Sequence, residues 1–213
     1  MHLLLIPLLL LLLPSPLWAA IAFDAQSTNE GTTSVTNSHT FGGGSNFAYI
    51  CVGYRDSGGA VAAPTAVTVD GNNATKLTDV LGLNNVVGSS VWSYNSPPSG
   101  TVNVVATGAA GTDFMLMVVR SYSGVDTAAP FGTPQSYNPV TSTANMDVTG
   151  IGSDTGQLGA LCGAARKGTA NTTFSADATS PVSTERADIT HSSGSPQISA
   201  TVYEENGASG TID

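Results

Sequence analysis

The sequence predicts an all-β fold, a single antiparallel β-sandwich made of two packed sheets. Two observations predict it. After residue 20, helical periodicity is almost absent, and β-branched or aromatic runs recur about every ten residues. Gly, Pro, Asn and Asp separate these runs and are typical of tight turns. Many short strands with such spacing are typical of a sandwich or a barrel.

Residues 1–20 are predicted to be a signal peptide. The apolar runs Leu3–Ile6 and Leu8–Leu13 precede small residues that leave the cleavage site open between Ala20 and Ala22. The apolar segment is short and broken by proline, whereas a membrane-spanning helix needs roughly 20 apolar residues. We therefore expect no stable membrane insertion after leader cleavage, and a mature chain that is secreted, extracellular or at the cell surface.

Residues 21–213 are long enough for one domain with one sizeable core. Each expected strand is rich in β-branched or aromatic residues and ends near a turn residue. Their number and short connections favour two antiparallel sheets of jelly-roll or immunoglobulin-like kind. In chain order the expected strands are Ile21–Gln26, Thr32–Thr40, Phe47–Tyr54, Ala66–Val69, Thr75–Val80, Ser89–Tyr94, Thr101–Thr107, Phe114–Tyr122, Asn145–Thr149, Leu158–Ala165, Val182–Thr190 and Ile198–Glu204.

Two of these segments carry further information. Asp70 and Gly71 separate two strands, and this pair supplies the positive φ angles that tight hairpins need. The run from Phe114 to Val119 is continuously apolar. Such a run predicts a central strand covered on both faces, or one whose outer face meets a partner.

The charge balance excludes one class of partner. Charged residues make up 10% of the chain, and the formal net charge is −9. The six basic residues are scattered, apart from the adjacent pair Arg166 and Lys167. Because nucleic acid binding needs clustered cations that neutralise phosphates, we expect no nucleic acid partner.

The two cysteines, Cys51 and Cys162, each lie inside an apolar run. An exported protein can form a disulfide, provided that the two Cα atoms come within roughly 7 Å. The alternatives are a disulfide between Cys51 and Cys162 and two buried free thiols, and the sequence favours the thiols. Asn73 and Asn171 begin Asn-x-Thr sequons and are candidate glycosylation sites. Glycans would supply the solubility that sparse charge does not.

No catalytic residue is predicted. The segment Asp56-Ser57-Gly58-Gly59 resembles the nucleophile segment of chymotrypsin-like serine proteases. Those enzymes place the base His far upstream of the Ser with an Asp between, whereas His39 lies only shortly before Ser57 in an unrelated setting. Asp, Ser and Gly are also what a turn after a strand requires. We therefore expect a turn.

Neither a carboxylate pair nor a metal site is predicted. Asp56 and Asp154 each begin an Asp-Ser/Thr-Gly motif like those of pepsin-like proteases, but polar or small residues precede them, which favours solvent-facing turns. His39 and His191 stand without metal-ligand spacing. His39 is expected to be a strand residue with a hydrogen-bonding partner. No cofactor is expected.

Six short motifs carry a resemblance: Ile21–Ala25, Ser38–Thr40, Val69–Gly71, Trp92–Tyr94, Pro97–Gly100 and Ser123–Asp126. They resemble motifs of exported and phage-encoded β-sandwich domains, which occur in surface proteins, virion decorations and tail components. The resemblance covers most of the mature chain and implies a fold rather than a function. Domains of this kind close with another apolar strand after the segment that matches Ile198–Glu204, which predicts either a missing last strand or a short terminal one.

Two functions from different classes follow. The first is a non-catalytic extracellular structural subunit of a filament, surface layer or virion, which binds copies of itself through sheet edges by strand addition. The alternative is a carbohydrate-binding or adhesion module, in which Trp92 and Tyr94 stack on glycans, although a face bearing both is more often core. The candidate assembly residues are Ile21, Phe23, Ile198, Val202 and Ile212.

Overall fold

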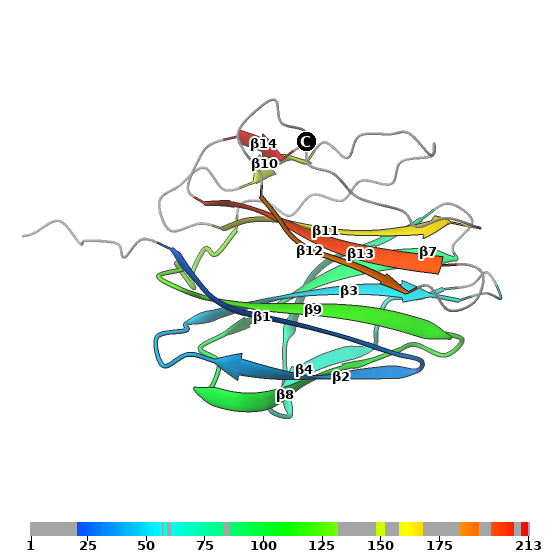
Figure 1. Cartoon of the computed structure of the whole chain (residues 1–213), viewed down its shortest axis with the longest axis horizontal. Helices are drawn as coiled ribbons and strands as arrows, with labels where there is room; N and C mark the ends of the chain where they lie inside the picture. Colours follow the sequence, from blue (N-terminus) through cyan, green and yellow to red (C-terminus); the bar gives the residue numbers. More distant parts are fainter. Residues whose placement is uncertain are drawn as a thin grey trace, which may run out of the picture.

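A computed structural model describes residues 21–56, 58, 61–82, 86–131, 148–151, 158–167, 184–191, 197–206 and 210–212 (Figure 1). Within these ranges the secondary structure is entirely β. The strands are β1 (Ala22–Gly31), β2 (Ser34–Phe41), β3 (Phe47–Arg55), β4 (Ala66–Val69), β5 (Asn72–Asn73), β6 (Thr75–Leu81), β7 (Val87–Asn95), β8 (Gly100–Thr107), β9 (Phe114–Ser123), β10 (Val148–Ile151), β11 (Leu158–Lys167), β12 (Thr184–His191), β13 (Gln197–Asn206) and β14 (Gly210–Ile212).

Two antiparallel sheets form a sandwich, as the sequence predicts. The larger sheet has the strand order β1-β9-β3-β7-β6, and the smaller has the order β2-β8-β4-β5. Neighbouring strands in both sheets run antiparallel. Figure 1 shows the smaller sheet lying below the larger one.

The main core fills the space between these two sheets. Alternate side chains of β3 and β9 point into it, among them Ile50, Val52, Met115, Met117 and Val119, which are all fully buried. On the opposite sheet, β2 alternates exposed and buried residues, as a half-buried strand does. Burying each large apolar side chain contributes about 1.5–3 kcal/mol. A one-residue shift of a strand would turn these buried side chains toward the other face of its sheet, so the period-two pattern sets the register of both sheets.

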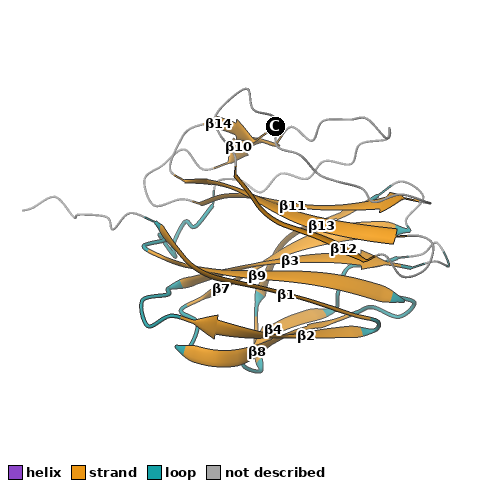
Figure 2. Ribbon diagram, in the orientation of Figure 1, coloured by secondary structure: helices purple, strands orange, loops and turns teal. Residues whose placement is uncertain are grey.

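A third layer, which the sequence did not predict, covers the other face of the larger sheet. It is a three-stranded sheet of order β11-β13-β12, and it lies over β3, β7 and β9 (Figure 2). A separate pair, β10 and β14, completes the described strands. The larger sheet is thus the middle of three layers, and Phe47, Tyr49, Val118 and Tyr122 are buried on its outer face.

Two predictions about individual segments are confirmed. Asp70 and Gly71 have φ angles of 50° and 79° and connect β4 to β5 in a tight hairpin. β9 is buried along nearly its whole length, with β1 on one side and β3 on the other. Because the third sheet covers its outer face, the apolar run of β9 needs no second molecule to bury it.

Candidate functional site at the β1 and β2 edges

β1 and β2 are edge strands of the two sandwich sheets and lie beside one another. Among the described strands, the backbone ladder of β1 is formed with β9 alone and that of β2 with β8 alone. β1 changes register between Phe23 and Ala25, as at a β-bulge. Between these two edges lies a network of polar side chains from Asp24, Ser27, His39 and Ser121. It is the strongest candidate site in the described part of the chain.

Asp24 organises the outer rim of this site. Its Oδ2 atom accepts hydrogen bonds from the Gly42 amide at 2.8 Å, the Ser45 hydroxyl at 2.6 Å and the Ser121 hydroxyl at 2.7 Å. Burial raises the pKa of Asp24, but the hydrogen bonds from Ser45, Gly42 and Ser121 and the charge of His39 outweigh that effect and lower it below 3.8. Asp24 is therefore an anion at neutral pH.

His39 occupies the buried end of the same network. Its Nε2 atom lies 3.1 Å from the Ser121 hydroxyl, and its Nδ1 atom lies 2.7 Å from the Ser27 hydroxyl. The expectation that His39 is a strand residue with a hydrogen-bonding partner is confirmed. Burial lowers the pKa of His39 below 6.5, although the negative charge of Asp24 acts in the opposite direction. The imidazole is therefore neutral at neutral pH.

The Ser, His and Asp of this network do not form a hydrolytic triad. In such a triad the His stands between the Asp and the Ser, whereas here Ser121 stands between His39 and Asp24. Ser121 is 0% exposed and His39 is 1% exposed, so a substrate cannot reach either group. The arrangement can hold a proton and fix the positions of two edge strands.

Phe23 lies on the opposite face of β1 from this network. It is a large hydrophobic residue that is 46% exposed. The guanidinium of Arg120 lies 4.5 Å from the centre of its ring, and the ring of Tyr122 lies 6.1 Å away, edge-on. Phe23 was a candidate assembly residue, and the structure places it at an accessible sheet edge.

The other candidate assembly residues have different surroundings. Ile21 is partly buried against the cluster beneath the third sheet. Ile198 and Val202 lie on β13, which is hydrogen-bonded to β11 on one side and β12 on the other. β13 therefore offers no open edge for strand addition. Ile212 lies on the short strand β14, opposite Val148 of β10.

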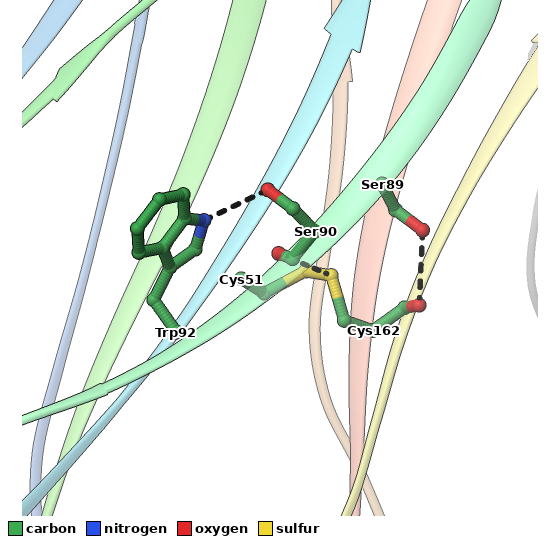
Figure 3. Close-up of a disulfide and its surroundings, with 5 residues drawn as sticks. All are labelled: Cys51, Ser89, Ser90, Trp92 and Cys162. Carbon is green, nitrogen blue, oxygen red and sulfur yellow. Dashed lines mark hydrogen bonds between the residues drawn. A yellow bond between two sulfur atoms is a disulfide. The ribbon is translucent and has the colours of Figure 1, made fainter. Parts of the chain in front are cut away.

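A disulfide joins Cys51 of β3 to Cys162 of β11, so the two free thiols that the sequence favoured are not present (Figure 3). The two Cα atoms are 5.5 Å apart. The Ser89 hydroxyl donates a hydrogen bond of 3.4 Å to the Cys162 carbonyl oxygen. The disulfide links the middle sheet covalently to the third sheet. Sequence could not indicate this pairing, because it depends on how the layers stack.

The proposed sugar-stacking pair does not form a platform. Trp92 is 6% exposed and lies in the core between the two sandwich sheets. Its indole Nε1 donates a hydrogen bond of 2.9 Å to the Ser90 hydroxyl (Figure 3). Tyr94 is partly buried against the same core. The Trp92 ring therefore has no face to offer a sugar, because alternating residues of β7 point inward.

The remaining sequence candidates are turn or surface residues where the structure describes them. Asp56 accepts a hydrogen bond of 2.6 Å from the Gly58 amide, as expected of a turn. Asn73 is exposed on β5. Asn171 and Asp154 lie outside the described residues, as does the side chain of His191.

Comparisons with known proteins add no assignment. The chain matches no protein-family model, and no curated protein or solved structure is significantly similar to it. The resemblance to exported and phage-encoded domains thus stays a prediction. In the described ranges, no group of three or more His, Cys, Asp or Glu side chains could hold a metal ion. No helix in those ranges is long and apolar enough to cross a membrane.

Proposed function

We propose that this chain is a non-catalytic structural subunit of an exported assembly, and that copies of it associate along the edge strand β1. The observation that carries the proposal is the combination of a ten-residue edge strand with an exposed aromatic residue, Phe23, on it. The backbone N–H and C=O groups along such an edge can pair with a strand of another chain.

The composition of β1 supports this proposal. Natural edge strands are commonly protected by Lys, Pro or a β-bulge. β1 contains neither Lys nor Pro, and its bulge is confined to Phe23–Ala25, which leaves the register regular from Ala25 to Gly31. Of its two acidic residues, Asp24 is bound to groups of its own chain. The exposed ring of Phe23, backed by Arg120, can supply an apolar contact to a second molecule.

The disulfide supports the exported part of the proposal. Disulfides persist in oxidising compartments and are rare in the cytosol. Cys51 is 0% exposed, so a bond between Cys51 and Cys162 is shielded from reductants once the third sheet is in place. A structural subunit outside the cell benefits from such a covalent link between layers.

Sedimentation velocity over a range of protein concentrations tests the proposal. The protein used is residues 21–213 with the disulfide intact. We expect concentration-dependent self-association that is lost in Thr28→Lys, because Thr28 is an exposed residue of β1 and a charge there disfavours strand addition. Asn103→Lys is the matched control, because Asn103 is exposed on β8, which is not an edge strand.

The two variants separate edge pairing from a general effect of charge. Association that survives in Asn103→Lys and disappears in Thr28→Lys supports pairing along β1. A wild-type protein that stays monomeric at the highest concentration contradicts the proposal. Equal association of both variants places the contact elsewhere and also contradicts it.

A further inference from the structure

We propose that the corner between β1 and β2 is a latch that opens in mild acid, with His39 as the proton-binding group. The latch consists of Ser27, His39, Ser121 and Asp24, which form a continuous chain of hydrogen bonds between three strands. This inference concerns the folded single chain and does not rest on the proposed assembly.

The hydrogen-bond partners determine which nitrogen of His39 carries the proton. The Ser121 hydroxyl has a single hydrogen, and its other neighbours, the Asp24 carboxylate and the Ala25 carbonyl, can only accept. That hydrogen is therefore unavailable to His39, and the Nε2 atom must be the donor in the 3.1 Å contact with Ser121. Nδ1 is then bare and accepts a hydrogen bond from the Ser27 hydroxyl.

A second proton on His39 would reverse the direction of its hydrogen bond with Ser27. The proton would bind to Nδ1, the atom that accepts from the Ser27 hydroxyl. Ser27 would have to turn its hydrogen away from the ring, and a positive charge would be left in a site that is 1% exposed. Burying an imidazolium without a paired anion is costly.

The surroundings of His39 compensate that charge only in part, because burial outweighs the effect of the nearby anion, Asp24. The strands packed against β2 are β1, β8 and β9. β8 has no titratable side chain, and Arg120 and Tyr122 of β9 lie on the opposite face of the middle sheet. β1 carries Asp24 and Glu30. The charge of Asp24 raises the pKa of His39, but burial has the larger effect, and Asp24 is hydrogen-bonded to Ser121 rather than to the imidazole. Glu30 is near the far end of the strand.

Opening of the corner relieves this cost. β1 and β2 are edge strands, so separating them from the sandwich breaks ladder hydrogen bonds on one side of each. The sign of the pH effect follows from the lowered pKa of His39: the closed corner is favoured above 6.5, and the preference is lost as the pH falls through the lowered value. A single proton changes the opening equilibrium by at most about tenfold per pH unit.

Hydrogen exchange followed by mass spectrometry tests the latch. Exchange in β1 and β2 is compared at about pH 7.5 and about pH 5.5, after correction for the intrinsic rate, at a concentration where the protein is monomeric. We expect faster exchange in β1 and β2 at the lower pH, with no comparable change in β3. In His39→Gln this pH dependence should disappear, whereas His191→Gln, which changes the other histidine of the mature chain, should retain it.

Unchanged exchange in the wild type, or the same acceleration in His39→Gln, would overturn the latch. If His39→Gln does not fold, the comparison of exchange in the wild type at the two pH values still tests the latch. Nitrogen-15 NMR of the imidazole at about pH 7.5 should find the proton of His39 on Nε2. A proton on Nδ1, or a charged ring at that pH, would equally contradict the mechanism.

Discussion

Cys51 and Cys162 are joined by a disulfide that ties the middle sheet to the third sheet and closes a loop with a sequence separation of 111 residues. Cys51 lies on β3, at the centre of the middle sheet, and Cys162 lies on β11. The disulfide therefore connects a buried central strand of the sandwich to the layer that covers it. The stability and the docking of the third sheet should both depend on it.

Removing this disulfide should destabilise the protein strongly. The double variant Cys51→Ala, Cys162→Ala should lose about 2–5 kcal/mol of unfolding free energy, because a long loop is no longer closed in the unfolded chain. Urea unfolding measures this difference. Ser89→Ala is the control, since it keeps the disulfide and removes only a weak hydrogen bond, and its loss should stay below about 1 kcal/mol. Equal stability of the double variant and the wild type would show that the link contributes nothing.

Gly88 should not tolerate a side chain. A Cβ atom at this position of β7 would lie 2.6 Å from the ring of Tyr54, which is fully buried. Gly88→Ala should therefore lower the unfolding free energy by about 1–3 kcal/mol. In Gly43→Ala, where a Cβ atom meets nothing within 4 Å, the loss should be much smaller. Thermal or urea unfolding compares the two variants, and similar losses would mean that Tyr54 does not fill the space beside Gly88.

Trp92 should act as a core residue rather than a sugar-binding one. Trp92→Ala should cost about 3–5 kcal/mol of unfolding free energy, because it leaves a cavity between the sandwich sheets. Phe23→Ala, at a position that is 46% exposed, should cost less. Urea unfolding of both variants checks this order. A folded Trp92→Ala variant of normal stability would contradict the inward position of the indole.

Tyr54 should stay protonated in alkali until the protein unfolds. Burial, and then the nearby charge of Asp79, raise the pKa of Tyr54 well above 10.0. Its contribution to stability is complete below 10.0 and is lost as the pH rises further, because the unfolded chain gives up the phenolic proton first. Tyr54→Phe should therefore resist alkaline unfolding better than the wild type. Circular dichroism against pH measures the unfolding of both proteins, and equal resistance to alkali would show that the phenol ionises in the folded state as readily as in the unfolded chain.

The strands of the sandwich could be predicted well because each is a local pattern. Observed bounds such as Phe47–Arg55 and Phe114–Ser123 differ from the predicted ones by a single residue at one end. The hairpin at Asp70 and Gly71 could be predicted for the same reason, since positive φ has a local sequence signature. The two-residue strand β5 was missed, because a segment so short has no periodicity. The three-residue strand β14 is a short terminal strand, one of the two alternatives that the sequence left open.

The third layer and the polar network could not be predicted in this way. Ser27, His39 and Ser121 come from three strands, and no sequence spacing connects them. Trp92 and Tyr94 show where periodicity stops being informative: it places both on one face but cannot say whether that face is inside. The disulfide depends on a layer whose position is set by long-range packing, which a single sequence does not encode locally.

The central claim is a three-layer β-structure in which a disulfide joins the middle sheet to the third sheet. Peptide mapping without reduction tests this claim most directly. The protein is exported from an expressing cell, alkylated without a reductant, digested and analysed by mass spectrometry. The account predicts one linked pair of peptides that contain Cys51 and Cys162, and no alkylated cysteine. Alkylation of both thiols in the folded protein would contradict it.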